Sequence, residues 1–245
     1  MICHQIIDNG RFITVKLLFS IICRHVPFWS RGEMIILIIT VHIARVSMAD
    51  PRTIVDLAPM APHYAVRALN DDLPLSVRRE AAGVGALLRD VLGVYEDARL
   101  VRSSFGKPEL ADANAPSISI SHAAGTVVLA VSEVAQLSGG PIGADIESMD
   151  EVSPLAVSRM ATTEERAWID AAGNQRERCR RMCQVWTRIE AVLKAQGSGF
   201  SVDPSKDGLP DGWNVSFTEY DGSVISCAAH FVPQIVLKEH IFHVG

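Results

Sequence analysis

The segment Pro141-Ile142-Gly143-Ala144-Asp145-Ile146-Glu147 joins a hydrophobic approach to two carboxylates that stand two residues apart. The hydrophobic approach predicts a β-strand. Because successive side chains of a strand point to opposite faces, Asp145 and Glu147 project from the same face. Carboxylates at a strand end are often simply solvated, so this pair alone is weak evidence for a site.

A third carboxylate lies with a lysine on a predicted helix. Glu190 and Lys194 stand at i and i+4 and therefore share a helix face. Such a pair alone is usually a surface salt bridge. Together, Asp145, Glu147 and Glu190 form a set of hard oxygen ligands suited to Mg²⁺, and the nearby lysine indicates a phosphate as the partner of the metal.

Composition narrows the class of protein. The chain has 245 residues, enough for one large domain or two small ones with a real core. Its net charge of −5 argues against non-specific nucleic-acid binding, which needs a basic surface. Five cysteines without a disulfide-framework spacing favour a reduced, cytoplasmic protein. Cys179 and Cys183 stand at i and i+4, but no second Cys or His pair has the spacing to complete a soft-metal site.

The first 33 residues differ from the rest of the chain. Their apolar run, 12–23, is too short to span a bilayer and is not followed by a convincing small-residue cleavage site. We expect residues 1–33 to be an extension outside the folded domain, with Met34 or Met48 as the functional start. Residues 34–46 are rich in β-branched side chains and predict a buried first strand.

The remaining segments predict a mixture of helices and strands. Residues 50–72 are polar and punctuated by prolines, so we expect a connection there. The other predicted elements are a helix over 75–92 with Gly93 as its C-cap, a strand at 100–103, a hairpin of 117–121 and 126–132, a helix that a capping box opens at 162–165 and that runs to 172, a helix over 176–196, and strands at 215–217 and 224–231. This order predicts an α+β fold with two halves joined near Gly139 and Gly140.

The joint order of the motifs resembles the 4′-phosphopantetheinyl transferase superfamily, in its larger type that activates surfactin synthetase and related carriers. The segments that carry the resemblance are Gly106-Lys107-Pro108, Ile118-Ser119-Ile120-Ser121-His122, Gly143-Ala144-Asp145-Ile146-Glu147, Trp186-Thr187-Arg188-Ile189-Glu190-Ala191-Val192-Leu193-Lys194, Gly197-Ser198-Gly199-Phe200 and Cys227-Ala228-Ala229-His230. Together they span residues 75–231.

Two positions depart from the family pattern. The family usually has a lysine directly before the helix glutamate, where this chain has Ile189. Ile189 falls on one apolar stripe with Met182, Trp186 and Leu193, which predicts that it packs in the core. The usual arginine of the first helix is also missing from its expected place, residues 83–86, and Arg78 or Arg79 is the expected substitute.

The resemblance implies a fold and a reaction. The fold is a pseudodimer of two similar α+β halves, residues 34–140 and 141–245, with the active site and coenzyme A in the cleft between them. The reaction moves 4′-phosphopantetheine from coenzyme A to a serine of an apo acyl or peptidyl carrier protein and releases adenosine 3′,5′-bisphosphate. The enzyme would be a holo-[acyl-carrier-protein] synthase that acts as a monomer, away from membranes.

The resemblance also implies roles for residues of the site. Asp145, Glu147 and Glu190 would hold Mg²⁺, with Mn²⁺ as an alternative, against the pyrophosphate. Lys194 would pair with a phosphate oxygen, and Glu190 would accept the proton of the carrier serine. The implied contacts to coenzyme A come from Lys107 at the 3′-phosphate end, from Ser121 and His122, and from Arg78 or Arg79.

Two other functions fit the same residues. A relative that binds coenzyme A but has lost transfer through Ile189 and the altered helix would bind tightly without modifying a carrier. A metal-dependent pyrophosphate hydrolase would use water in place of the carrier serine and would release the bisphosphate without any carrier.

Overall fold

A computed structural model describes residues 36–112, 114–132, 140–199, 204 and 208–242, together with two strands near the N-terminus. These two strands, β1 (Cys3–Asp8) and β2 (Arg11–Lys16), pair antiparallel in a sheet of their own. The rest of the N-terminal 35 residues lies outside the described part, so the expected extension over residues 1–33 stays a prediction.

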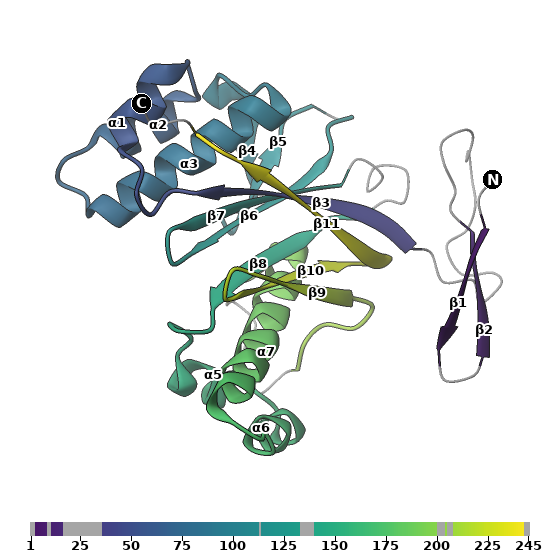
Figure 1. The fold of residues 1–245 in the computed structure, drawn as a ribbon. Helices are drawn as coiled ribbons and strands as arrows, with labels where there is room; N and C mark the ends of the chain where they lie inside the picture. Colours follow the sequence, from purple (N-terminus) through teal and green to yellow (C-terminus); the bar gives the residue numbers. More distant parts are fainter. Residues whose placement is uncertain are drawn as a thin grey trace.

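Two sheets face each other at the centre of the molecule (Figure 1). The first sheet has the order β11-β3-β7-β6 and the second the order β8-β10-β9. Every neighbouring pair is antiparallel except β11 with β3, which is parallel. The strands are β3 (Ile36–Arg45), β6 (Ser117–Ala123), β7 (Thr126–Ser132), β8 (Gly143–Ser148), β9 (Asn214–Tyr220), β10 (Ser223–Ala229) and β11 (Val232–His240).

Helices cover the outer face of each sheet (Figure 1). The first sheet carries α1 (Pro51–Leu57), α2 (Pro62–Leu69) and α3 (Leu75–Leu92), and the second carries α5 (Pro154–Met160), α6 (Thr163–Asp170) and α7 (Gln175–Gln196). Between α3 and β6 lie the short 3-10 helix Asp97–Arg99 and the small hairpin of β4 (Leu100–Arg102) and β5 (Pro108–Leu110).

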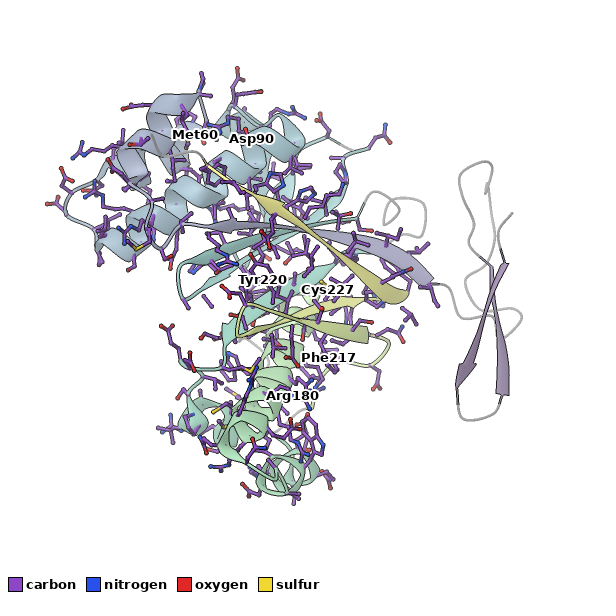
Figure 2. The ribbon with its side chains drawn as sticks, viewed as in Figure 1. Met60, Asp90, Arg180, Phe217, Tyr220 and Cys227 are labelled. Carbon is purple, nitrogen blue, oxygen red and sulfur yellow. The ribbon has the colours of Figure 1, made fainter. Side chains whose placement is uncertain are left out.

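The period-2 alternation of the strands sorts their side chains between these layers. In β3, Ile39, Val41 and Ile43 point to the opposite sheet, whereas Ala44 packs under the helices. Figure 2 shows Cys227 in the inner layer between the two sheets, where it belongs to the same buried cluster. Two further apolar clusters lie between the second sheet and its helices.

Several predictions of local structure are confirmed. The helix over 75–92 ends at Gly93 with a φ of 62°, and α7 ends at Gly197 with a φ of 71°, both left-handed C-caps. The capping box at the start of α6 is present, with Thr162 accepting from Glu165 N–H and Glu165 accepting from Thr162 N–H.

The prediction of a connection over residues 50–72 is wrong, because this segment forms α1 and α2. Pro51 and Pro62 stand at the first positions of these helices, where a missing N–H costs nothing and the fixed φ suits the helix. Asp50 caps α1 by accepting from Arg52 N–H. The prolines therefore mark helix starts and not a continuous loop.

The C-terminal strand β11 was not predicted. It pairs with β3, so a strand from the last residues completes the sheet of the first half. The α5 helix was also missed, although Ser153 caps it and Pro154 stands at its first position. The division of the chain at residue 140 stays a prediction.

Candidate functional site

The two strand carboxylates point toward α7. Ala144 and Ile146 of β8 pack in the inner layer between the sheets, so Asp145 and Glu147 lie on the opposite face, as the spacing predicts. Glu190 and Lys194 stand on α7, which covers that face. Strand and helix therefore bring together the four residues that the sequence singled out.

Gly143 allows β8 and α7 to approach this closely. A Cβ atom added to Gly143 would lie 1.9 Å from Ala191 O and 2.4 Å from Ala195 N, which are backbone atoms of α7. Only glycine fits this contact. The neighbouring carboxylate of Asp145 is thereby held against the last turns of the helix.

We expect Gly143→Ala to lower the free energy of unfolding by about 3 kcal/mol, because a methyl group must push helix and strand apart. Urea unfolding monitored by circular dichroism measures the loss. The matched control is Gly173→Ala, whose added Cβ meets no atom within 4 Å, and which should stay within about 0.5 kcal/mol of the wild type. Equal stability of the two variants would contradict the close contact of β8 with α7.

Lys194 links three polar side chains. Its Nζ lies 2.5 Å from Asp145 Oδ1, 2.9 Å from Ser121 Oγ and 3.4 Å from Glu190 Oε2. Ser121 in turn donates its hydroxyl to Asp145 Oδ1 at 2.7 Å. Burial alone would lower the pKa of Lys194, but the carboxylates of Asp145 and Glu190 raise it above its ordinary value, so the ammonium stays charged.

Asp145 is the most deeply buried of the three carboxylates, with an exposed fraction of 1%. Its Oδ1 is bound by Lys194 and Ser121, whereas its Oδ2 has no hydrogen-bond partner. A buried acceptor without a partner is costly in a folded protein and calls for an explanation. A ligand with a positive charge would supply the missing partner.

The two glutamates are held in an environment that disfavours their charged forms. Trp186 Nε1 donates to Glu147 Oε1 at 3.2 Å. Burial, and then the negative charges of Asp145 and Glu190, raise the pKa of Glu147 to about 7. Burial and the charge of Asp145 also raise the pKa of Glu190. The raised pKa values reflect the crowding of three carboxylates around one lysine, which a cation bound beside them would relieve.

The carboxylates are nevertheless not arranged as a finished metal centre. Within the described residues, no three His, Cys, Asp or Glu side chains are grouped as ligands of one ion. Lys194 lies between Asp145 and Glu190 and takes up part of their charge. The alternative of a cysteine metal clip gains no support, since Cys183 is buried and its pKa is raised to about 12, first by burial and then by Glu147.

The serines of β6 join the two sheets. Ile118 and Ile120 point to the helices of the first sheet, which leaves Ser117, Ser119 and Ser121 on the side of β8. Ser119 Oγ accepts from Ala144 N–H at 2.9 Å. Ser117 donates to the carbonyl of Gly140. Ser121 therefore belongs to a row of polar contacts between β6 and β8, at the site itself.

His122 follows Ser121 but points elsewhere. Its Nδ1 lies 3.4 Å from Glu80 Oε2 of α3, and its side chain is 51% exposed. It thus stands at the margin of the site, open to a ligand. Its predicted contact to a phosphate stays a prediction.

The predicted basic residues of α3 bind elsewhere. Arg78 pairs with Asp71 and donates to Ala68 O, and Arg79 donates to Ala49 O. These contacts fasten α3 to the segment before it. The predicted contacts of both arginines to coenzyme A gain no support from this geometry.

Lys107 is also held by the protein itself. Its Nζ donates to Ile142 O at 2.9 Å and to Ala195 O at 3.4 Å. Burial lowers the pKa of this lysine. Its predicted contact to the 3′-phosphate end stays a prediction.

A cavity of about 220 Å³, which the sequence did not indicate, lies beside the Gly-Lys-Pro turn. It is lined by His63, Tyr64, Asp97, Leu100, Arg102 and Pro108. Arg102 donates to Gly106 O at 3.2 Å and lies 3.1 Å from His63 Nε2. The sequence feature that could have indicated this cavity is Arg102 on the predicted strand 100–103. In the structure this arginine pairs with Pro108 across the small hairpin.

Comparison with known proteins supports one family. Residues 141–240 match the family model of the 4′-phosphopantetheinyl transferase superfamily. The matched segment contains Asp145, Glu147, Glu190 and Lys194 but spans less than half of the chain. The match shows that this segment is similar to the superfamily. No curated protein matches the chain.

The described helices do not indicate membrane insertion. None of them combines the length and the apolar character that crossing a membrane requires.

Proposed function

We propose that this protein transfers 4′-phosphopantetheine from coenzyme A to a serine of an apo acyl or peptidyl carrier protein and releases adenosine 3′,5′-bisphosphate. The observation that carries the proposal is the group formed by Asp145, Lys194 and Ser121, with Glu147 and Glu190 beside it. A half-buried cation and three carboxylates suit a ligand that carries both phosphates and a metal ion. The family match over the segment that holds four of these five residues supports the same reaction.

The topology supports a pseudodimer of the larger, surfactin-synthetase-activating type. Each half contains a strand, a set of helices and then a hairpin, β6–β7 in the first half and β9–β10 in the second. In each half the first of these strands pairs with the second strand of the hairpin, β3 with β7 and β8 with β10. The order β3-β7-β6 of the first half is thus repeated as β8-β10-β9 in the second. β6 and β8 contact each other through the serines of β6, and these contacts support a site between the proposed halves.

The carboxylates present fit Mg²⁺ in their chemistry. Asp145, Glu147 and Glu190 offer the hard oxygen ligands that this ion prefers, and the partnerless Oδ2 of Asp145 is an acceptor that an ion would satisfy. Bound there, Mg²⁺ or Mn²⁺ would neutralise negative charge on the pyrophosphate of coenzyme A.

The residues of the chain supply the remaining functions. Lys194 holds a positive charge at the site and would bind a phosphate oxygen. Ser121 keeps both Lys194 and Asp145 in place, and His122 is open to a phosphate at the margin. Glu190, beside Lys194, is the proposed acceptor of the proton from the carrier serine.

We propose that the nucleotide end of coenzyme A binds in the cavity beside the Gly-Lys-Pro turn. Arg102 and His63 offer donors to a 3′-phosphate, and Tyr64 and Leu100 offer apolar surface to a base.

Arg102→Ala should therefore raise the KM for coenzyme A about tenfold and leave kcat unchanged, because one phosphate contact is lost. Steady-state kinetics checks this, with Arg99→Ala, an exposed arginine paired with Asp112, as the matched control. An unchanged KM in Arg102→Ala would reject this cavity as the nucleotide site.

Measurement of bisphosphate release with and without carrier separates the three candidate reactions. A transferase releases adenosine 3′,5′-bisphosphate from coenzyme A only when an apo carrier is present. A pyrophosphate hydrolase releases it without carrier, and a binding protein that has lost transfer releases none in either case. We expect release that depends on the carrier. Cytoplasmic location, monomeric state and the absence of nucleic-acid partners stay predictions.

A further inference from the structure

Lys107 crosses from the first half of the chain to the second. Its backbone is fixed in a tight turn, in which Ser103 N–H donates to Lys107 O and Lys107 N–H donates to Ser103 Oγ. From this turn the side chain reaches Ile142 O, just before β8, and Ala195 O, in the last turn of α7. The ammonium therefore touches both elements that carry the site.

Lys107 donates to a carbonyl group at the C-terminal end of α7. The last carbonyls of a helix lack partners within the helix, and a cation near them is favoured. Gly197 N–H satisfies the carbonyls of Leu193 and Lys194, which leaves Ala195 O for Lys107. The side-chain stem of Lys107 also lies beside Gly197, since a Cβ added there would be 3.8 Å from Lys107 Cδ.

The two half-buried lysines cross the contact between the halves in opposite directions. Lys107 of the first half binds carbonyls of the second, while Lys194 of the second half binds Ser121 of the first. Lys194 directly precedes Ala195, whose carbonyl Lys107 holds. A shift of this helix end would thus move Lys194 away from Asp145.

We propose that Lys107 is a positioning residue that fastens the end of α7 to β8 and so keeps Lys194 on Asp145 and Ser121. Lys107 acts through these neighbours and not through the 3′-phosphate of coenzyme A. The part of the inference that concerns transfer rests on the proposed function. The part that concerns the helix end does not.

The test compares Lys107→Met, which keeps the apolar stem and removes the ammonium, with Lys238→Met. Lys238 is exposed on β11 and serves as the matched control. In the ligand-free protein, Lys107→Met should lower Tm by roughly 4–8 °C. Hydrogen exchange measured by mass spectrometry should speed up about tenfold in peptides that cover residues 190–199, because the helix end opens more often.

Kinetics with two donors separates positioning from phosphate binding. Lys107→Met should lower kcat about tenfold with both coenzyme A and 3′-dephospho-coenzyme A, and the ratio of the two KM values should stay that of the wild type. Lys107→Arg, which keeps a cation at this position, should restore part of kcat. Lys238→Met should match the wild type in every measurement.

Three results would overturn the inference. Loss of the preference for the 3′-phosphate, with unchanged Tm and exchange, would make Lys107 a ligand contact. A lower Tm with unchanged kcat would make it a helix cap without influence on the site. Unchanged hydrogen exchange at residues 190–199 in Lys107→Met would also overturn the inference. This measurement needs no activity, so it decides the question even if the wild type modifies no carrier. In that case, faster exchange confined to these residues would still support the fastening of the helix end by Lys107.

Discussion

The Asp145→Asn variant is expected to lose carrier modification by about a thousandfold at saturating Mg²⁺, because it removes the buried charge at the centre of the site. Asp145 Oδ1 binds Lys194 and Ser121, and its Oδ2 is the buried acceptor without a partner. Asparagine keeps the shape and one acceptor oxygen, but it offers neither a negative charge nor a second oxygen. The rate of carrier modification under saturating coenzyme A measures the loss.

Two comparisons make this result specific. Asp150→Asn makes the same change at an exposed carboxylate just after β8 and should keep the wild-type rate. The far-ultraviolet circular dichroism spectrum of Asp145→Asn should match that of the wild type, because the amide fills the same space. Retained transfer at saturating Mg²⁺ would contradict the proposed role of Asp145 as a ligand of the metal.

The Ile189→Lys variant is expected to lose about 4 kcal/mol or more in the free energy of unfolding, because a charge is placed in the core without a partner. Ile189 has an exposed fraction of 0% and packs in the cluster between β10 and the α5–α7 helices. The structure thus confirms that Ile189 is a core residue, as its stripe on the helix predicted. Urea unfolding measures the loss, and recovery of soluble protein should fall with it.

The control for this variant is Ile189→Val, which removes one methylene and should cost only about 1 kcal/mol. If Ile189→Lys instead kept wild-type stability and raised the turnover, the isoleucine would be a handicap at the site and the packing interpretation would be wrong.

Local patterns predicted most elements of the fold. The helix over 75–92, the hairpin of β6 and β7, and the capping box of α6 follow from periodicity and cap residues that lie close in sequence. The prediction of a connection over residues 50–72 was wrong because prolines occur both in loops and at the first position of a helix. Pro51 and Pro62 stand at first helical positions. The strand β11 was not predicted, because its partner β3 lies about 200 residues away and such a pairing leaves no local signal in the sequence.

In the candidate site as well, local spacing predicted some contacts and could not predict others. Spacing alone predicted that Asp145 and Glu147 share a face of β8 and that Glu190 and Lys194 share a face of α7. Spacing could not predict that Lys194 binds Ser121, which is 73 positions away. Nor could it predict that Lys107 turns to the carbonyls of Ile142 and Ala195, since that direction depends on how the halves pack.

The most direct test of the proposed function is the intact mass of apo carrier proteins after incubation with the enzyme, coenzyme A and Mg²⁺. The panel should contain fatty-acid, polyketide, non-ribosomal peptide and siderophore carriers, because the residues of the site do not identify the carrier. We expect at least one carrier to gain the mass of one phosphopantetheine group. The gain should require Mg²⁺, and a carrier with its acceptor serine changed to alanine should gain nothing. Tight binding of coenzyme A with no mass gain on any carrier would contradict the proposed function.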